Sequence, residues 1–128
     1  MTFIVQHELW DGNLQDHSDQ GVAVLVTGEA NGKNTTLLRF NCFDIEKSYI
    51  YGPDNENKLF RMDPTVDGNP VGWTVKQIRT KLHEMLRQAG YPDIADKVDG
   101  ELVADALRQL ESAAREKYAT ERNTVKHN

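Results

Sequence analysis

The stretch "TGEANGKNTT", residues Thr27–Thr36, decides how the first half of the chain folds. It has some features of a phosphate-binding loop, whose pattern is G-x-x-x-x-G-K-[ST] between a strand and a helix. However, three residues rather than four separate Gly28 from Gly32, and Asn34 stands where Ser or Thr is required. The residues that follow are strand-like, so no helix N-terminus would be present to hold a phosphate. Asn31-Gly32 is instead the favoured pair for a two-residue type I′ turn, which predicts a β-hairpin.

This turn also predicts a register for the hairpin. With Asn31 and Gly32 at the turn, Ala30 opposes Lys33 and the pairs count outward from there. One predicted face is apolar and has the pairs Leu25–Leu38, Ala23–Phe40 and Gly21–Cys42. The other is mixed and has the pairs Val26–Leu37, Val24–Arg39 and Val22–Asn41. Because a slip of one residue would exchange the two faces, this separation supports the register.

Further strands are expected where apolar residues alternate and β-branched or aromatic residues recur. These segments are Phe3–Trp10, Ser48–Tyr51 and Lys58–Met62, and "GPDNEN" (Gly52–Asn57) is expected to form the turn between the last two. The connections are short, so the strands, about five in number, should be mostly antiparallel. The segment Asp63–Gly72 is dense in Pro and Gly and is expected to be a loop.

Helical periodicity begins after this loop. Thr74 and Gln77 have the spacing of a capping box, and Gly90 supplies a stop signal for the first helix. Its apolar residues form one stripe, Val75, Ile78, Leu82, Met85, Leu86 and Ala89. A short turn around Pro92–Val98 should follow.

The second helix should begin near Asp99 or Gly100 and end at about Arg122. Its apolar residues span an arc of about 160°, wider than a helix on one sheet usually needs. They are Leu102, Val103, Ala106, Leu107, Leu110, Ala113, Ala114 and Tyr118. Strands followed by helices predict an α+β fold, an antiparallel sheet of about five strands covered on one face by two C-terminal helices. We expect a single domain over residues 1–122 and a flexible tail over residues 123–128.

Composition narrows the classes of function. The 128 residues carry a net charge of −5, and residues 1–70 have five Lys and Arg against eleven Asp and Glu. An acidic first half disfavours nucleic-acid binding, which depends on neutralising phosphates. No segment has the apolar length that spanning a membrane requires, and the N-terminus lacks the features of a signal peptide. The single cysteine, Cys42, excludes an intramolecular disulfide and fits a reducing compartment, so a cytoplasmic protein is expected.

Two groups of residues suggest chemistry. Cys42 is a candidate nucleophile, but the predicted register places it beside Phe40 on the apolar face, where a free cysteine behaves as a small hydrophobic residue. His7, Asp11 and His17 could together bind a metal, although histidines ten residues apart match no defined ligand pattern. We therefore predict no catalytic residue, no metal and no cofactor.

Two surfaces suggest binding. Four cationic side chains lie on one arc of the first helix, which could dock an acidic or otherwise anionic partner or could be a solvated flank, and we favour the flank. They are Lys76, Arg79, His83 and Arg87. The aromatic residues Tyr49, Tyr51, Phe60 and Trp73 gather near the second hairpin and the long loop. They could line a ligand pocket or close one end of the core, and we favour the core.

The sequence thus predicts a non-catalytic binding or assembly module. The wide apolar arc of the second helix favours a homodimer in which Leu107 and Tyr118 contact a second copy of the chain. Neither a nucleic acid nor a membrane is expected as a partner. The alternative is a small enzyme with a loop-borne, possibly metal-dependent site near His7, Asp11 and His17.

Overall fold

The computed structural model describes the backbone of residues 1–12, 17–62 and 70–126, and the side chains of these residues except 10–12, 17–18 and 114–126. Five strands precede the helices. The strands are β1 (Thr2–Gly12), β2 (His17–Ala30), β3 (Lys33–Phe43), β4 (Lys47–Tyr51) and β5 (Lys58–Arg61). The helices are α2 (Pro70–Gln88), α3 (Pro92–Ala95) and α4 (Gly100–Lys126).

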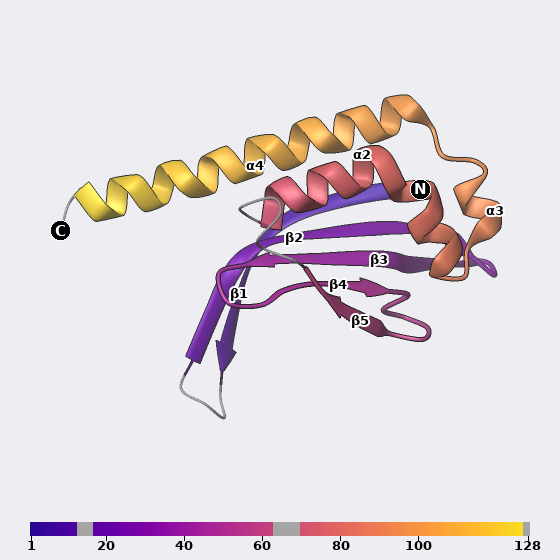
Figure 1. Cartoon of the computed structure of the whole chain (residues 1–128), viewed down its shortest axis with the longest axis horizontal. Helices are drawn as coiled ribbons and strands as arrows, with labels where there is room; N and C mark the ends of the chain where they lie inside the picture. The colour runs from indigo at the N-terminus through magenta and orange to yellow at the C-terminus, as the bar shows by residue number, and fades with distance from the viewer. Residues whose placement is uncertain (13–16, 63–69, 127–128) are drawn as a thin grey trace.

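The strands form one open antiparallel sheet in the order β1-β2-β3-β4-β5. Both long helices lie on the same side of this sheet, as Figure 1 shows. α2 contacts β3 and β4, whereas α4 contacts β1 and β2, and the two helices contact each other. The predicted α+β fold, with one face of the sheet covered by two C-terminal helices, is confirmed. In the described part of the chain, each helix is too short or too polar to cross a lipid bilayer.

The Asn31-Gly32 turn has the predicted geometry. Asn31 has φ 53° and Gly32 has φ 79°, and Ala30 pairs with Lys33. Two consecutive positive φ angles define a type I′ turn, whose twist matches that of the flanking strands. The hairpin prediction, and with it the rejection of a phosphate-binding loop, is confirmed.

The predicted register holds for only four pairs and is wrong beyond them. The ladder shifts by one residue between Val26 and Thr27, so that Thr27 pairs with Thr36 but Val26 pairs with Leu38. Leu37 is the extra residue of a β-bulge, which sets two residues of one strand against one of the other. Both Leu37 and Leu38 are buried, an arrangement that a regular strand would not allow on a single face.

The turn between β4 and β5 satisfies backbone groups near this bulge. The Leu37 carbonyl oxygen accepts a hydrogen bond of 2.9 Å from the Gly52 N–H. The Thr36 N–H donates a 2.9 Å hydrogen bond to the Asp54 carboxylate. Because unpaired backbone groups are costly when withdrawn from water, these contacts stabilise the shifted register.

The shift exchanges the faces predicted for β2. Val22, Val24 and Val26 pair with Cys42, Phe40 and Leu38 in the core under the helices, whereas Ala23 and Leu25 pair with Asn41 and Arg39. The predicted pairs Leu25–Leu38, Ala23–Phe40, Gly21–Cys42, Val26–Leu37, Val24–Arg39 and Val22–Asn41 are therefore wrong. The sequence pattern had no signal for the bulge, since valine and leucine suit either face.

A polar network crosses the face of the sheet that the helices leave open. Arg39 forms an ion pair with Glu8 and donates a 2.8 Å hydrogen bond from Nε to Asn41 Oδ1. Asn41 in turn donates to the Ser48 hydroxyl at 3.0 Å. Asn41 and Ser48 are fully buried, so the network satisfies polar groups that would otherwise be costly to bury.

The first helix begins earlier than predicted. α2 starts at Pro70, so Thr74 lies inside the helix and the predicted capping box with Gln77 is wrong. The Thr74 hydroxyl instead donates a 2.8 Å hydrogen bond to the Pro70 carbonyl oxygen. Pro70 fits the start of a helix because its fixed φ is helical and its missing N–H has no partner there.

The predicted end of α2 is confirmed. Gly90 has φ 98°, the Tyr91 N–H donates to the Leu86 carbonyl and the Gly90 N–H donates to the Arg87 carbonyl. This pair of hydrogen bonds is a Schellman motif. α4 continues to Lys126, past the end predicted at Arg122. The flexibility of residues 123–128 stays a prediction.

Replacing Gly32 tests the turn. Gly32→Val should lower the free energy of unfolding by more than about 1 kcal/mol, because a β-branched residue resists a positive φ. Gly32→Asn is the control, since asparagine tolerates the left-handed region. Chemical denaturation measures both, and equal midpoints for the wild type and Gly32→Val would contradict the assignment.

A second prediction concerns Gly21, where β2 and β3 approach closely. A Cβ on Gly21 would lie 2.2 Å from the Cys42 carbonyl oxygen and 2.5 Å from the Phe43 Cα. Gly21→Ala should therefore destabilise the fold by about 1–3 kcal/mol through overpacking. At Gly100 the added Cβ meets nothing within 4 Å, so Gly100→Ala is the matched control. A melting temperature that Gly21→Ala leaves unchanged would show that the strands are further apart.

Candidate functional site

A cluster of four aromatic rings lies between α2 and the hairpin of β4 and β5. Tyr49 stacks on Phe60 with ring centroids 5.3 Å apart and an interplanar angle of 19°. On the other side, Tyr49 contacts Trp73 at 4.8 Å. Tyr51 contacts Phe60 at 5.0 Å and Tyr49 at 5.7 Å. We call these four side chains, Tyr49, Tyr51, Phe60 and Trp73, the aromatic surface.

Strand register brings these rings together. Tyr49 pairs with Phe60 across β4 and β5, and also with Phe40 across β3 and β4. Tyr49 and Tyr51 are two residues apart in β4, so both point to the side of the sheet that carries the helices. Trp73, in the first turns of α2, contacts both Phe40 and Tyr49. The cluster therefore continues the core toward the β5 edge of the sheet.

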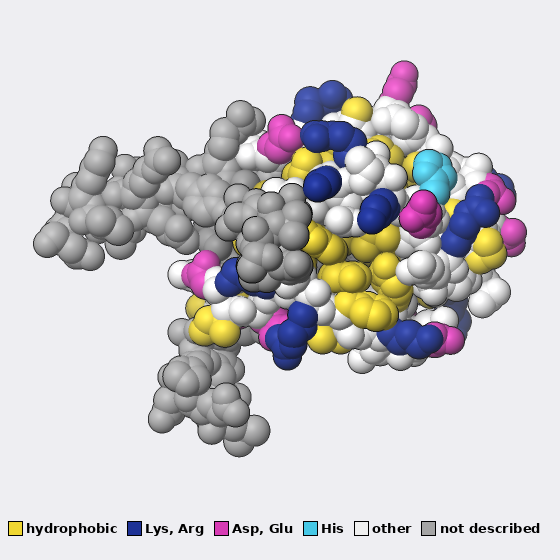
Figure 2. Space-filling model, in the orientation of Figure 1, with side chains coloured by type: hydrophobic (Ala, Val, Ile, Leu, Met, Phe, Trp, Pro, Cys, Tyr) yellow, Lys and Arg dark blue, Asp and Glu magenta, His cyan; other side chains and the backbone are white. Residues whose placement is uncertain are grey.

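The helices do not finish covering these rings. Phe60 remains 41% exposed, and Tyr49, Tyr51 and Trp73 are only half-buried. Figure 2 shows hydrophobic side chains at the surface between α2 and the β4–β5 hairpin, with Lys and Arg side chains on both sides of them. The predicted gathering of the four aromatic residues is thus seen, but they form an open surface.

The two tyrosine hydroxyls are available to a partner. Burial raises the pKa of Tyr49 above its usual value. Burial is also the largest cause of the raised pKa of Tyr51, to which the nearby Tyr49 and Glu84 contribute. Both phenols are therefore neutral near pH 7 and can donate a hydrogen bond. Neither hydroxyl has a hydrogen-bond partner among the described residues.

Charged side chains of both signs lie near the aromatic surface. Lys58 and Arg61 lie at the two ends of β5, and they form ion pairs with Glu56 at 3.0 Å and with Glu46 at 3.4 Å. Lys58 is on the same side of the sheet as Phe60, whereas Arg61 is on the opposite side, as its pairing with Ser48 requires. On α2, Lys81 is exposed, and Glu84 lies close enough to Tyr51 to contribute to its raised pKa. The sequence analysis did not single out Lys58, because only the register of β5 places it beside the rings.

Two side chains of the arc predicted on α2 contact segments that follow this helix. Arg79 forms an ion pair with Glu111 of α4 at 3.7 Å, and Arg87 forms one with Asp96 after α3. Lys76 and His83 are exposed. Two of the four predicted partner-binding residues thus contact carboxylates of their own chain, which favours the solvated flank. Binding of an anionic partner to Lys76, Arg79, His83 and Arg87 stays a prediction.

The two residues predicted to contact a second copy lie on α4. Leu107 is half-buried and packs against the hydrophobic core, as do Leu102 and Val103. α4 contacts α2, β1 and β2, and a contact of Leu107 with a second copy of the chain stays a prediction. The side chain of Tyr118 lies outside the described residues.

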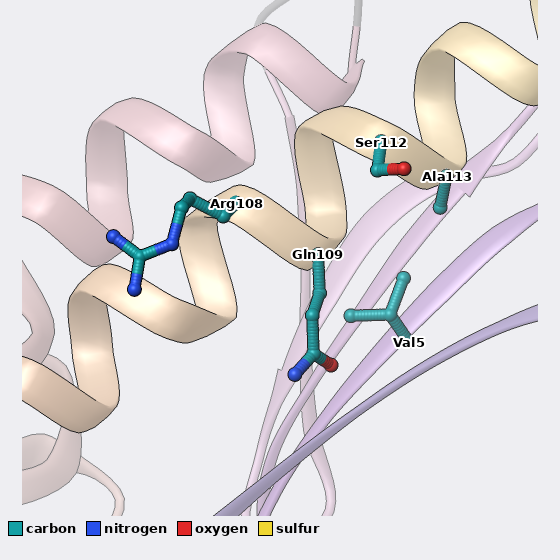
Figure 3. A pocket seen from close by; sticks show the side chains of 5 residues that line it. All are labelled: Val5, Arg108, Gln109, Ser112 and Ala113. Atoms are coloured by element: carbon teal, nitrogen blue, oxygen red, sulfur yellow. The ribbon is translucent and has the colours of Figure 1, made fainter.

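An open groove lies between α4 and β1, as Figure 3 shows. Its volume is about 360 Å³, and its lining residues are Val5, Arg108, Gln109, Ser112 and Ala113. Val5 is the strand residue among these, and Gln109 extends from α4 toward the sheet. Arg108 forms an ion pair with Asp105, one turn earlier in α4. This lining offers an amide, a hydroxyl and a guanidinium, and it contains no pair of an acid and a base.

The residues of the predicted enzyme site do not lie side by side in the ladder. His7 and Asp11 are both in β1, about 13 Å apart along the strand at the usual rise per residue. His17 pairs with Gly12, a further residue along, and the side chains of Asp11 and His17 lie outside the described residues. Among the described residues, no three His, Cys, Asp or Glu side chains could hold a metal ion.

Cys42 lies in the core, as predicted. Its side chain is 1% exposed, and its sulfur is 3.2 Å from the Thr74 hydroxyl and 3.5 Å from the Pro70 carbonyl oxygen. The Cys42 sulfur thus lies beside a hydroxyl and a carbonyl oxygen, and neither group is a base that would generate a thiolate. The structure favours the structural interpretation of Cys42.

Thiol labelling tests this interpretation of Cys42. A water-soluble disulfide reagent should react slowly with the native protein and rapidly after denaturation, because the buried sulfur is reached only through opening of the fold. Cys42→Ala should reduce stability by about 1 kcal/mol through loss of buried volume. If the native protein were instead labelled at the rate of an exposed thiol, the result would support the hypothesis that Cys42 is a nucleophile.

Comparison with known proteins places the chain in a family. Neither the search of curated proteins nor the search of solved structures found a match. A profile for the family described as "Domain of unknown function (DUF7700)" matches residues 1–114. That match covers all five strands, α2, α3 and the first half of α4. The chain therefore belongs to the family described as a domain of unknown function, DUF7700.

Proposed function

We propose that the domain is a non-catalytic binding module that uses the aromatic surface to hold an acidic segment of a partner protein. The single observation that carries the proposal is the exposure of four mutually contacting rings at the edge of an otherwise covered core. Tyrosine and tryptophan are enriched in the parts of protein interfaces that contribute most to binding. Rings already packed against each other lose little side-chain entropy when a partner covers them.

Charge supports an acidic partner. Lys58 lies beside the rings on the side of the sheet that carries them, its ion pair with Glu56 is exposed, and Lys81 is exposed on α2. Exposed ion pairs contribute little to stability, so a partner carboxylate can replace an intrachain one at small cost. The partner would place apolar side chains on Phe60 and Trp73, accept hydrogen bonds from the tyrosine hydroxyls, and direct its carboxylates to the cations.

The cytoplasm is the compartment that we propose for this module. The single cysteine is buried, and nothing in the described fold depends on a disulfide. A cytoplasmic partner would meet the aromatic surface under reducing conditions, which leave Cys42 unchanged.

Selection from a random peptide library identifies the preferred partner chemistry. The purified domain is immobilised, and bound peptides of about 12 residues, long enough to cover the four rings in an extended conformation, are sequenced. We expect enrichment of sequences that combine aromatic or leucine residues with Asp and Glu. Enrichment of basic sequences would contradict the proposed charge complementarity, and failure to enrich any sequence would contradict the binding function.

Neighbouring residues of β5 supply a matched pair of variants. Phe60 belongs to the aromatic surface, whereas Leu59 is 50% exposed and points to the other side of the sheet. Phe60→Asp should weaken binding of a selected peptide by about 30-fold or more, the effect of losing an interface hot spot, whereas Leu59→Asp should leave it unchanged. Isothermal titration calorimetry measures both. Equal weakening by the two variants would place the peptide elsewhere on the sheet.

A further inference from the structure

The two edge strands of the sheet differ in their protection against pairing with another chain. Natural proteins protect an edge by keeping the strand short and by placing charged residues or proline on it. β5 follows this rule, because it has only four residues and both its first residue, Lys58, and its last, Arg61, are charged. β1 does not, because its 11 residues, TFIVQHELWDG, include no Lys, Arg or Pro.

Glu8, the acidic residue of β1 whose side chain the structure describes, leaves the edge open to a like strand. Glu8 forms an ion pair with Arg39 of β3 and accepts a 2.7 Å hydrogen bond from Gln6. Its charge is therefore compensated within the chain and repels a second copy little. Ile4 and Leu9 are 39% and 63% exposed on this strand, which adds apolar side chains that a neighbouring strand would cover.

α4 provides a second, independent observation. The helix contacts β1 and then continues past the sheet, as Figure 1 shows. The groove in Figure 3 opens between this helix and β1, and Val5 of β1 is the strand residue that lines it. The groove therefore lies at the β1 edge of the sheet, where a strand added beside β1 would lie next to α4.

We infer that β1 pairs antiparallel with β1 of a second copy of this chain, joining the two sheets across a two-fold axis. A two-fold axis makes one edge complementary to itself, so each β1 supplies and receives the same set of backbone hydrogen bonds. Each α4 would extend toward the sheet of the other copy. The groove between α4 and β1 in each copy would be closed by the β1 strand of the other copy. This dimer goes beyond the proposed binding function, since the aromatic surface lies near the opposite edge and stays accessible.

Sedimentation and hydrogen exchange test this dimer. The wild type should be a dimer at about 200 µM and dissociate on dilution, and exchange of β1 backbone amides should be slower at the higher concentration. Amides of β5 should exchange at the same rate at both concentrations, which provides an internal control. A wild type that remains monomeric, or β1 exchange that does not depend on concentration, would overturn the inference.

Variants of the two edges separate this interface from others. Ile4→Lys with Gln6→Lys adds like charges to the open side of β1 and should weaken the dimer by about 10-fold or more. Leu59→Lys, at a similarly exposed position on β5, should leave the dimer intact. A dimer that survives the double substitution but is lost in Leu107→Arg would move the interface to α4 and refute pairing through β1. If the double variant does not fold, the concentration dependence of β1 exchange in the wild type decides.

Discussion

The pairing of β2 with β3 determines which side of every other strand meets the helices. These are the long central strands of the sheet, and side chains alternate along each, so a single register assigns all neighbouring faces. The Asn31-Gly32 turn starts the register, and the bulge at Leu37 shifts it by one residue. Hydrogen bonds from Gly52 and to Asp54 hold the bulge, so the β4–β5 turn takes part in setting the register.

The aromatic surface follows from the same register. Once Phe40 faces the helices, its partner Tyr49 must do so as well, and Tyr49 in turn brings Phe60 to that side. α2 contacts β3 and β4, and α4 lies on the other side of α2, over β1 and β2. The two helices therefore leave the β5 side uncovered. A single constraint thus produces both the closed core at β2 and β3 and the exposed rings beside it.

The open face of the sheet has a different character. The small residues Gly21 and Ala23 of β2 leave room there, and Arg39 and Glu8 meet between β3 and β1, which flank β2. A polar network replaces a second layer of helices, because Asn41 and Ser48 are buried and satisfied without one. This arrangement explains how a fold of two layers, one sheet and one layer of helices, remains stable although one face of the sheet is uncovered.

Local signals in the sequence predicted most of the fold. Asn31-Gly32 specified a turn, Gly90 specified a helix end, and alternation specified the strands, because each depends on neighbouring residues. The bulge could not be predicted, since Val22, Val24 and Val26 are as apolar as Ala23 and Leu25, and contacts with the distant residues Gly52 and Asp54 help to hold it.

The same limit applies to the candidate site. The sequence showed that Tyr49, Tyr51, Phe60 and Trp73 lie near one another, and it placed Cys42 in the core. Their exposure depends on how far α2 reaches across the sheet, which no local pattern encodes. Lys58 could be placed beside the rings only once β5 had a position at the edge. The open edge of β1 could be recognised only once the strand order was known.

The register of the central hairpin is the claim on which the rest of the account depends, and proton–proton contacts in solution measure it directly. Nuclear Overhauser effects between backbone protons of β2 and β3 report which residues face each other. The structure predicts contacts of Val24 with Phe40 and of Val22 with Cys42. Contacts of Val24 with Arg39 and of Val22 with Asn41 would contradict it, because they require an unbulged hairpin with the valines on the open face.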